Sequence, residues 1–265
     1  MEFSRWSALL LGVALAGVGC NWNANLGSVG DGSVSLLWKS TFEVGNLSEW
    51  TADNLGGTEF SNGISRGPGI SSMAHRGNHG AEVIVFPTQG MASVSYLYRL
   101  QPTPPAAYYS AFFYVPGTIY VPAGSYLSLC HFRSSTTPNG TGVYAAWDVN
   151  LYTQANGSLV AQMYDFKTDM PQSPPVTPFP TDQWVQLEVL LDKAVPTDAG
   201  TPTGRVAVWQ DGKLILDHQD IATVQSSYLE WDIGGTSINI QPDPISIYVD
   251  DAAISLVRLG LDIPF

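Results

Sequence analysis

Apolar and polar residues alternate along most of the chain after residue 35. In the segment 184–191 every second residue is aliphatic, at Val185, Leu187, Val189 and Leu191. An alternation with a period of two predicts a β-strand with one face in a core and the other face in water. The segments 127–133, 143–152 and 159–166 also fit strands, whereas no segment keeps a helical period of 3.6 residues for three turns.

Turn signals separate these short apolar runs. Asn-Gly or Asp-Gly pairs stand at 62–63, 139–140, 156–157 and 211–212, and such pairs tolerate the positive φ of hairpin turns. The turn at 211–212 predicts a hairpin that pairs Gln210 with Lys213, Trp209 with Leu214 and Val208 with Ile215. The proline-rich stretches 102–105 and 171–180 are expected to be loops. Together these signals predict an all-β, two-sheet antiparallel jelly-roll β-sandwich.

Composition narrows the class of protein further. Charged residues make up only 13% of the chain, Gly and Pro number 26 and 18, and the net charge is −12. This composition suits an extracellular β protein with many turns, and the acidic surface argues against nucleic acid as a partner. The chain has two cysteines, which excludes a disulfide framework, and Cys130 falls in a predicted strand as a buried thiol.

The N-terminus has the order of an export signal. Arg5 precedes the apolar run 8–19, which is shorter than the roughly 20 residues that span a bilayer, and Cys20 follows. The passage resembles the lipobox of bacterial lipoproteins, although Gly17 stands where that family usually has leucine. We expect a signal peptide at 1–19, a lipid on Cys20 with a flexible tether to residue 35, and a jelly-roll domain at 36–265. The alternative is an ordinary signal cleaved near Gly19, with secretion instead of an anchor in the cell envelope.

Three passages resemble the concanavalin A-like lectin/glucanase superfamily, including its laminin-G-like and polysaccharide-lyase-like members. They are STFEVGNLSEW at 40–50, WVQLE at 184–188 with GRVAVWQDG at 204–212, and IYVDDAAIS at 247–255. The resemblance implies a fold and not an activity, because that fold carries lectins, hydrolases, lyases and adhesion modules.

The closing strand changes the phase of its alternation at Asp250-Asp251, which predicts a β-bulge. In related jelly rolls a calcium ion often joins the first and last strands near such an acid. The resemblance therefore points to Glu43 and Asp251 as candidate calcium ligands. The alternative is a carboxylate capped by backbone N–H groups or paired with Arg258.

Polar residues of three predicted strands suggest chemistry on a concave sheet. A lyase neutralises a uronate carboxylate, removes the neighbouring proton and protonates the leaving oxygen, which needs Arg, Gln, His and Tyr side chains. The candidate catalytic residues for such a reaction are His131, Arg133, Gln162 and Tyr164. The candidate ligand-binding residues are Tyr144, Asp148, Asn150, Tyr152, Trp184 and Gln186.

A glycoside hydrolase fits the sequence less well than a binding protein does. Glu230 and Asp232 lie two residues apart, but Gly235 stands where the superfamily's hydrolases have a second glutamate, so we expect ordinary surface or turn acids. We expect a lectin-like protein that binds a polysaccharide through its concave sheet. The alternatives are a lyase that cleaves a uronate polymer by β-elimination and an adhesion module without a small ligand.

Overall fold

The computed structural model describes residues 35–50, 67–85, 93–138, 144–166, 170–172, 177–193, 204–223 and 226–261. The predicted signal peptide, Cys20, nearly all of the tether and the turns at 62–63 and 139–140 lie outside these residues. In the described ranges the regular elements are strands, and no helix there could cross a membrane.

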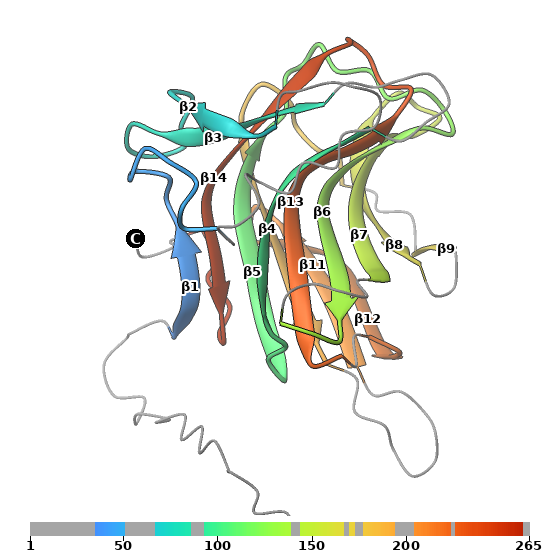
Figure 1. Cartoon of the computed structure of the whole chain (residues 1–265). Coiled ribbons are helices and arrows are strands. Elements are labelled where there is room, and N and C mark those ends of the chain that lie inside the picture. Colours follow the sequence, from blue (N-terminus) through green and yellow to red (C-terminus); the bar gives the residue numbers. More distant parts are fainter. Residues whose placement is uncertain are drawn as a thin grey trace, which may run out of the picture. The chain divides into compact units, whose positions relative to one another are not determined.

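Two antiparallel sheets form a β-sandwich, as the alternation predicted (Figure 1). The eight-stranded sheet has the order β12 (Lys213–Ile221), β11 (Gly204–Gln210), β10 (Trp184–Asp192), β5 (Ala106–Tyr114), β14 (Ile245–Ser255), β3 (Gly80–Val85) and β2 (Gly69–Ser71), and β1 (Leu36–Ser40) also pairs with β14. The six-stranded sheet has the order β4 (Ser93–Pro102), β13 (Tyr228–Ile238), β6 (Tyr126–Ser135), β7 (Tyr144–Thr153), β8 (Leu159–Asp165) and β9 (Met170–Gln172).

The apolar faces of the two sheets meet in one core. Trp147, Trp231, Tyr109 and Phe132 are among its largest fully buried side chains. Cys130 is buried in the same core, as its strand position predicted. Since inward and outward positions alternate, the residues between these core positions project from the outer faces of the sheets.

The predicted hairpin at 205–217 is confirmed, with one change in register. Asp211 and Gly212 have positive φ, and the Gln210–Lys213 and Trp209–Leu214 pairs form as expected. The prediction for Val208 was wrong, because it pairs with Leu216 and not with Ile215. A register shift takes up the extra residue.

Two further local predictions have different outcomes. The bulge in the closing strand is confirmed by a register shift between Asp250 and Ala253 and by a φ of 47° at Asp251. The stretch 171–180 is not all loop, because Pro171 lies in the short strand β9. β9 is the edge of its sheet, where a missing N–H donor is tolerated.

The outer face of β10 is not exposed to solvent at Gln186 and Glu188, contrary to the prediction from its alternation. Glu188 is fully buried there, and its carboxylate accepts hydrogen bonds from the Leu259 backbone N–H at 2.6 Å and from Arg258 Nε at 3.1 Å. The Gln186 amide donates to Ser110 Oγ at 2.9 Å and to the Gly260 carbonyl. The C-terminal segment 256–261 therefore covers this face, and it comes from about 70 residues further along the chain.

Candidate functional site

Polar side chains form a transverse row on the outer face of the six-stranded sheet. Direct pairs across four neighbouring strand interfaces join Tyr98 to Asp232, Asp232 to His131, His131 to Asp148, and Asp148 to Tyr164. Directly opposed residues in antiparallel strands project from the same face. One row across β4, β13, β6, β7 and β8 thus gathers two tyrosines, two aspartates and a histidine.

His131 and Asp148 form a buried pair at the centre of this row. His131 Nδ1 lies 2.7 Å from Asp148 Oδ1, and the two side chains are 7% and 3% exposed. His131 Nε2 is buried and has no hydrogen-bond partner among the described residues. Asp148 Oδ1 has no hydrogen-bond partner among the described residues either, so its contact with the ring is one of charge and distance. A carboxylate against one ring nitrogen favours a proton there and leaves the other nitrogen to accept one.

Arg133 occupies the next outward position on β6, opposite Glu230 of β13. Its Nε lies 2.7 Å from Asp232 Oδ2, and its guanidinium lies 3.7 Å from Glu230 Oε1 and 4.6 Å from the centre of the Tyr96 ring. The expectation that Glu230 and Asp232 are ordinary surface or turn acids was wrong, because both carboxylates are buried beside this cation.

The environment of the row shifts the pKa values of Asp232 and Arg133. Burial raises the pKa of Asp232 well above its usual range; Arg133 opposes this rise, and the charges of Glu230 and Asp148 add to it. Burial acts to lower the pKa of Arg133, but the attraction of Asp232 and Glu230 raises it overall. Because titratable groups with shifted pKa values cluster at functional sites, these residues mark the row as the candidate site.

The raised pKa of Asp232 predicts a stability that falls as pH rises. The folded state holds this proton at pH values where the unfolded chain has lost it, so its contribution is complete below the unfolded pKa and is lost as pH rises through the folded pKa. We expect the melting temperature of Asp232→Asn to depend less on pH than that of the wild type across this window. Equal slopes in thermal melts of the two proteins would contradict the prediction.

Other predicted site residues fall on the same face at greater distance along the strands. Asn150 and Gln162 pair directly across β7 and β8, and Tyr152 lies two residues beyond Asn150. Tyr144 begins β7 opposite Ser134, and its side chain lies outside the described residues.

Trp184 and Gln186 do not join this site. They belong to β10 in the other sheet, where Trp184 packs near His75 and Tyr114 and Gln186 is buried under the C-terminal segment. Their place in the predicted ligand-binding set is therefore a correction. The error arose because parity assigns a residue to a face of its own strand but does not say to which sheet that strand belongs.

Sequence reasoning missed four members of this face, namely Tyr96, Tyr98, Glu230 and Asp232. The alternation of β13, with Leu229, Trp231 and Ile233 in the core, already placed its two acids on the opposite face. The missing information was the neighbour of β13, since the strand lies between β4 and β6, far from both in sequence.

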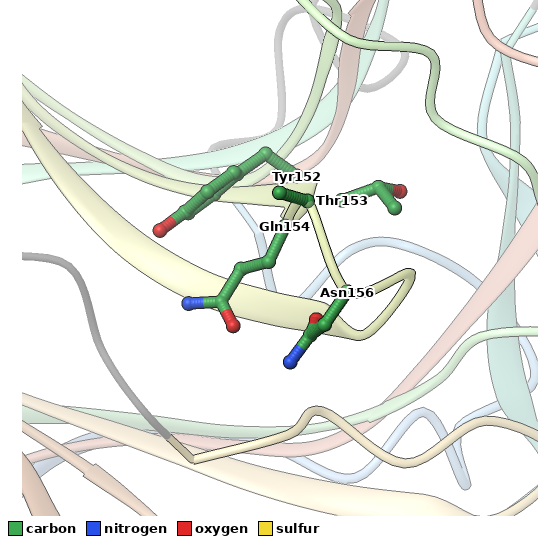
Figure 2. A pocket seen from close by; sticks show the side chains of 5 residues that line it. Tyr152, Thr153, Gln154 and Asn156 are labelled. Atoms are coloured by element: carbon green, nitrogen blue, oxygen red, sulfur yellow. The ribbon is translucent and has the colours of Figure 1, made fainter.

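A shallow depression lies near the end of this face, where β7 turns into β8. It has a volume of about 510 Å³ and is lined by Tyr152, Thr153, Gln154, Ala155 and Asn156. Figure 2 shows the Tyr152, Gln154 and Asn156 side chains projecting to the same side of the chain. The turn at 156–157 was predicted, and a hydrogen bond from the Gly157 N–H to the Gln154 carbonyl forms it.

The two candidate calcium ligands contact the same loop. Glu43 Oε1 accepts hydrogen bonds from the backbone N–H groups of Asn78 and His79, each at 2.8 Å, and these bonds lower the pKa of Glu43. Asp251 Oδ2 lies 2.7 Å from His75 Nδ1. Within the described ranges, no three His, Cys, Asp or Glu residues form a metal-binding group. The neighbours of the two carboxylates named above are nitrogen groups and not the oxygen ligands that calcium prefers, so calcium at this place stays a prediction.

The fold is a two-sheet antiparallel jelly-roll sandwich, and comparisons with known proteins agree with this class. No family model and no curated protein matches the sequence. Among solved structures, the chain is similar to an endo-β-1,4-glucuronan lyase from the fungus Trichoderma reesei, with a TM-score of 0.58 and 12% identity over 84% of this chain and 96% of that chain.

Two further structures have the same fold. The cellulose-induced protein Cip1 has a TM-score of 0.56 and 15% identity, over 84% of this chain and 98% of its own. The catalytic domain of a glycoside hydrolase family 131 protein from Coprinopsis cinerea has a TM-score of 0.54 and 14% identity, over 85% and 96% of the two chains. At these identities the comparisons establish the jelly-roll fold, and the activity must be argued from the site.

Proposed function

We propose that this protein is a polysaccharide lyase that cleaves a uronate-containing polymer by β-elimination. The observation that carries the proposal is the His131–Asp148 pair, whose 2.7 Å contact leaves His131 Nε2 without a partner among the described residues. A binding face has no need of a base held in this way, whereas proton abstraction requires one.

The reaction assigns a role to each neighbour. His131 Nε2 takes the C5 proton beside the uronate carboxylate, the C4–O bond breaks, and a C4=C5 double bond forms while a tyrosine gives its proton to the leaving oxygen. Tyr96, which lies next to the Arg133 guanidinium, and Tyr164, at the end of the row, are the candidate acids. Gln162 faces the same side of the sheet, and we assign it to the binding of a sugar hydroxyl.

Arg133 is the candidate partner of the uronate carboxylate. Its side chain is 19% exposed, and its Nε lies 2.7 Å from Asp232 Oδ2. The raised pKa of Asp232 favours its protonated form, which leaves more of the positive charge of Arg133 for a substrate anion. Neutralising that anion makes the C5 proton more acidic, which is the central demand of β-elimination.

Ultraviolet absorbance of the unsaturated product tests this proposal on alginate, glucuronan and glycosaminoglycans. A steady rise with purified protein supports the lyase. Retention on a polysaccharide column without turnover would favour the lectin-like alternative. The absence of both turnover and retention would favour the adhesion module. New reducing ends without the unsaturated product would indicate hydrolysis, for which Glu230 and Asp232 are the nearest acids.

We further propose that the protein is exported and held in the cell envelope by a lipid on Cys20. The support is the sequence order of Arg5, the apolar run 8–19 and the cysteine. In bacterial cells fed a labelled fatty acid, the wild type is expected to carry the label in the membrane fraction, and Cys20→Ala is expected to lose it. A labelled Cys20→Ala protein, or an unlabelled wild type, would refute the anchor.

Calcium near Glu43 and Asp251 is proposed as a structural ion. Because both acids contact the loop 75–79, an ion there would tie that loop to the first and last strands. EDTA is then expected to lower the melting temperature of the wild type, and Asp251→Asn is expected to remove this effect. An unchanged wild-type melting temperature in EDTA would exclude the ion.

A further inference from the structure

The depression at the end of β7 suggests which polymer the site accepts. We infer that it is a subsite for a neutral sugar, and that the substrate combines uronate residues with neutral sugars instead of being a uronate homopolymer. That the substrate contains uronate residues rests on the proposed lyase function. That it also contains neutral sugars rests on the depression itself.

The first argument is the position of the depression. Tyr152 lies four residues from Asp148 on the same strand and the same face, which corresponds to about 13 Å at 3.3 Å per residue. A polymer whose uronate lies at His131 and which runs along β7 therefore reaches the depression with a different sugar ring. Asn150 and Gln162 pair directly between the two places and continue the same polar face.

The second argument is the chemistry of the lining. None of the five residues that line the depression is charged. Tyr152 contributes an aromatic ring, and Gln154 and Asn156 contribute planar amides on the same side (Figure 2). The Asn156 oxygen accepts a hydrogen bond from the Ser158 backbone N–H, so its NH₂ group is the part that a sugar hydroxyl would contact. An aromatic ring with a few planar polar groups suits the apolar face and the hydroxyls of a neutral sugar, and a cation to pair with a second uronate carboxylate is missing from this lining.

The third argument is electrostatic. The chain carries a net charge of −12, and on the described part of the site Arg133 contacts two carboxylates, those of Asp232 and Glu230, while a third, that of Asp148, pairs with His131. A homopolymer with a carboxylate on every ring would bring more negative charge close to these acids than a polymer with spaced uronates.

Kinetics on matched polymers test the inference. Hyaluronan, which alternates glucuronate with N-acetylglucosamine, and glucuronoxylan represent mixed polymers, and glucuronan and alginate represent homopolymers. We expect a higher kcat/KM on a mixed polymer. The electrostatic part of this preference should be lost in 0.5 M NaCl, where charges are strongly screened, and the part that comes from the uncharged depression should persist. A preference for homopolymers, or one that vanishes in salt, would overturn the neutral subsite.

Variants of the depression provide the second readout. Tyr152→Ala and Gln154→Ala are expected to raise KM for the mixed polymer at least several-fold while kcat stays close to that of the wild type. Gln219→Ala, which removes an exposed amide from β12 in the other sheet, is the matched control and is expected to change neither constant. An unchanged KM in both depression variants would refute the subsite.

A binding measurement separates this inference from the lyase proposal. In affinity electrophoresis through gels that contain glucuronoxylan or a neutral xylan, the wild type is expected to be retarded and Tyr152→Ala to be released. If no polymer is cleaved but this pattern holds, the lyase proposal fails and the neutral subsite stands. If the wild type runs unretarded, or Tyr152→Ala is retarded equally, the subsite is refuted whatever the catalytic result.

Discussion

Replacing His131 with alanine is expected to abolish formation of the unsaturated product. The imidazole is the one base on this face with a carboxylate at 2.7 Å on one nitrogen and, among the described residues, no partner on the other. General-base catalysis contributes typically about 10²–10⁴-fold, so we expect a loss of kcat of that order. The loss should appear in kcat more than in KM, because the imidazole removes the proton in the transition state and does not contribute to binding of the sugar in the ground state.

Two companion variants make this result specific. Asp148→Asn keeps the size of the side chain but removes the charge that orients His131, so it is expected to lower kcat as well. His218→Ala removes a histidine from β12 in the other sheet and is expected to leave the rate unchanged. Wild-type turnover in a folded His131→Ala protein, checked by circular dichroism, would refute the lyase mechanism.

Replacing Arg133 with methionine is expected to cause the largest loss of stability on this face. The Arg133 side chain is only 19% exposed, and Asp232, its partner at 2.7 Å, is fully buried. Removing one partner of a buried pair leaves an uncompensated charge and typically costs about 3–5 kcal/mol of the free energy of unfolding. Asp232 keeps its proton and carries no charge until the pH passes its raised pKa. The cost therefore appears in full only above that pKa, and the measurement is urea unfolding at alkaline pH.

A surface arginine serves as the matched control. Arg205 Nε donates to Asp217 Oδ1 at 2.8 Å, but the two side chains are 37% and 25% exposed. Exposed ion pairs contribute about 0–1 kcal/mol, so Arg205→Met should change the free energy of unfolding little. Adding Asp232→Asn to Arg133→Met is expected to recover part of the loss, because the stranded acid is then neutral. If Arg133→Met and Arg205→Met lowered the free energy of unfolding equally, the argument from burial would be wrong.

Parity along single strands accounts for the correct part of the sequence prediction. The period-two pattern placed His131 with Arg133, and Gln162 with Tyr164, on the outer faces of their strands. Trp147 lies between outward positions of its strand and is found in the core, as the same alternation requires. Turn residues such as Asp211-Gly212 located a hairpin to within one register step, since only a few residue types adopt positive φ at low cost.

The failures share a different cause. Glu230 and Asp232 were taken for ordinary acids because nothing in the segment 228–238 shows that it pairs with β6, some 100 residues earlier in the chain. Trp184 and Gln186 were assigned to the wrong sheet for the same reason. Glu188 is buried by a segment 70 residues away, and the sequence around Glu188 does not show that another segment covers it.

The amino-acid sequence by itself determined that this chain is built from alternating strands and turns, and which side chains leave each strand on its polar side. Those properties follow from local backbone geometry, which each residue and its near neighbours control. Only the tertiary structure decided that Tyr98, Asp232, His131, Asp148 and Tyr164 stand in one row. Strand order and register are set by the packing of the whole core, so the raised pKa of Asp232 depends on partners brought from distant parts of the chain.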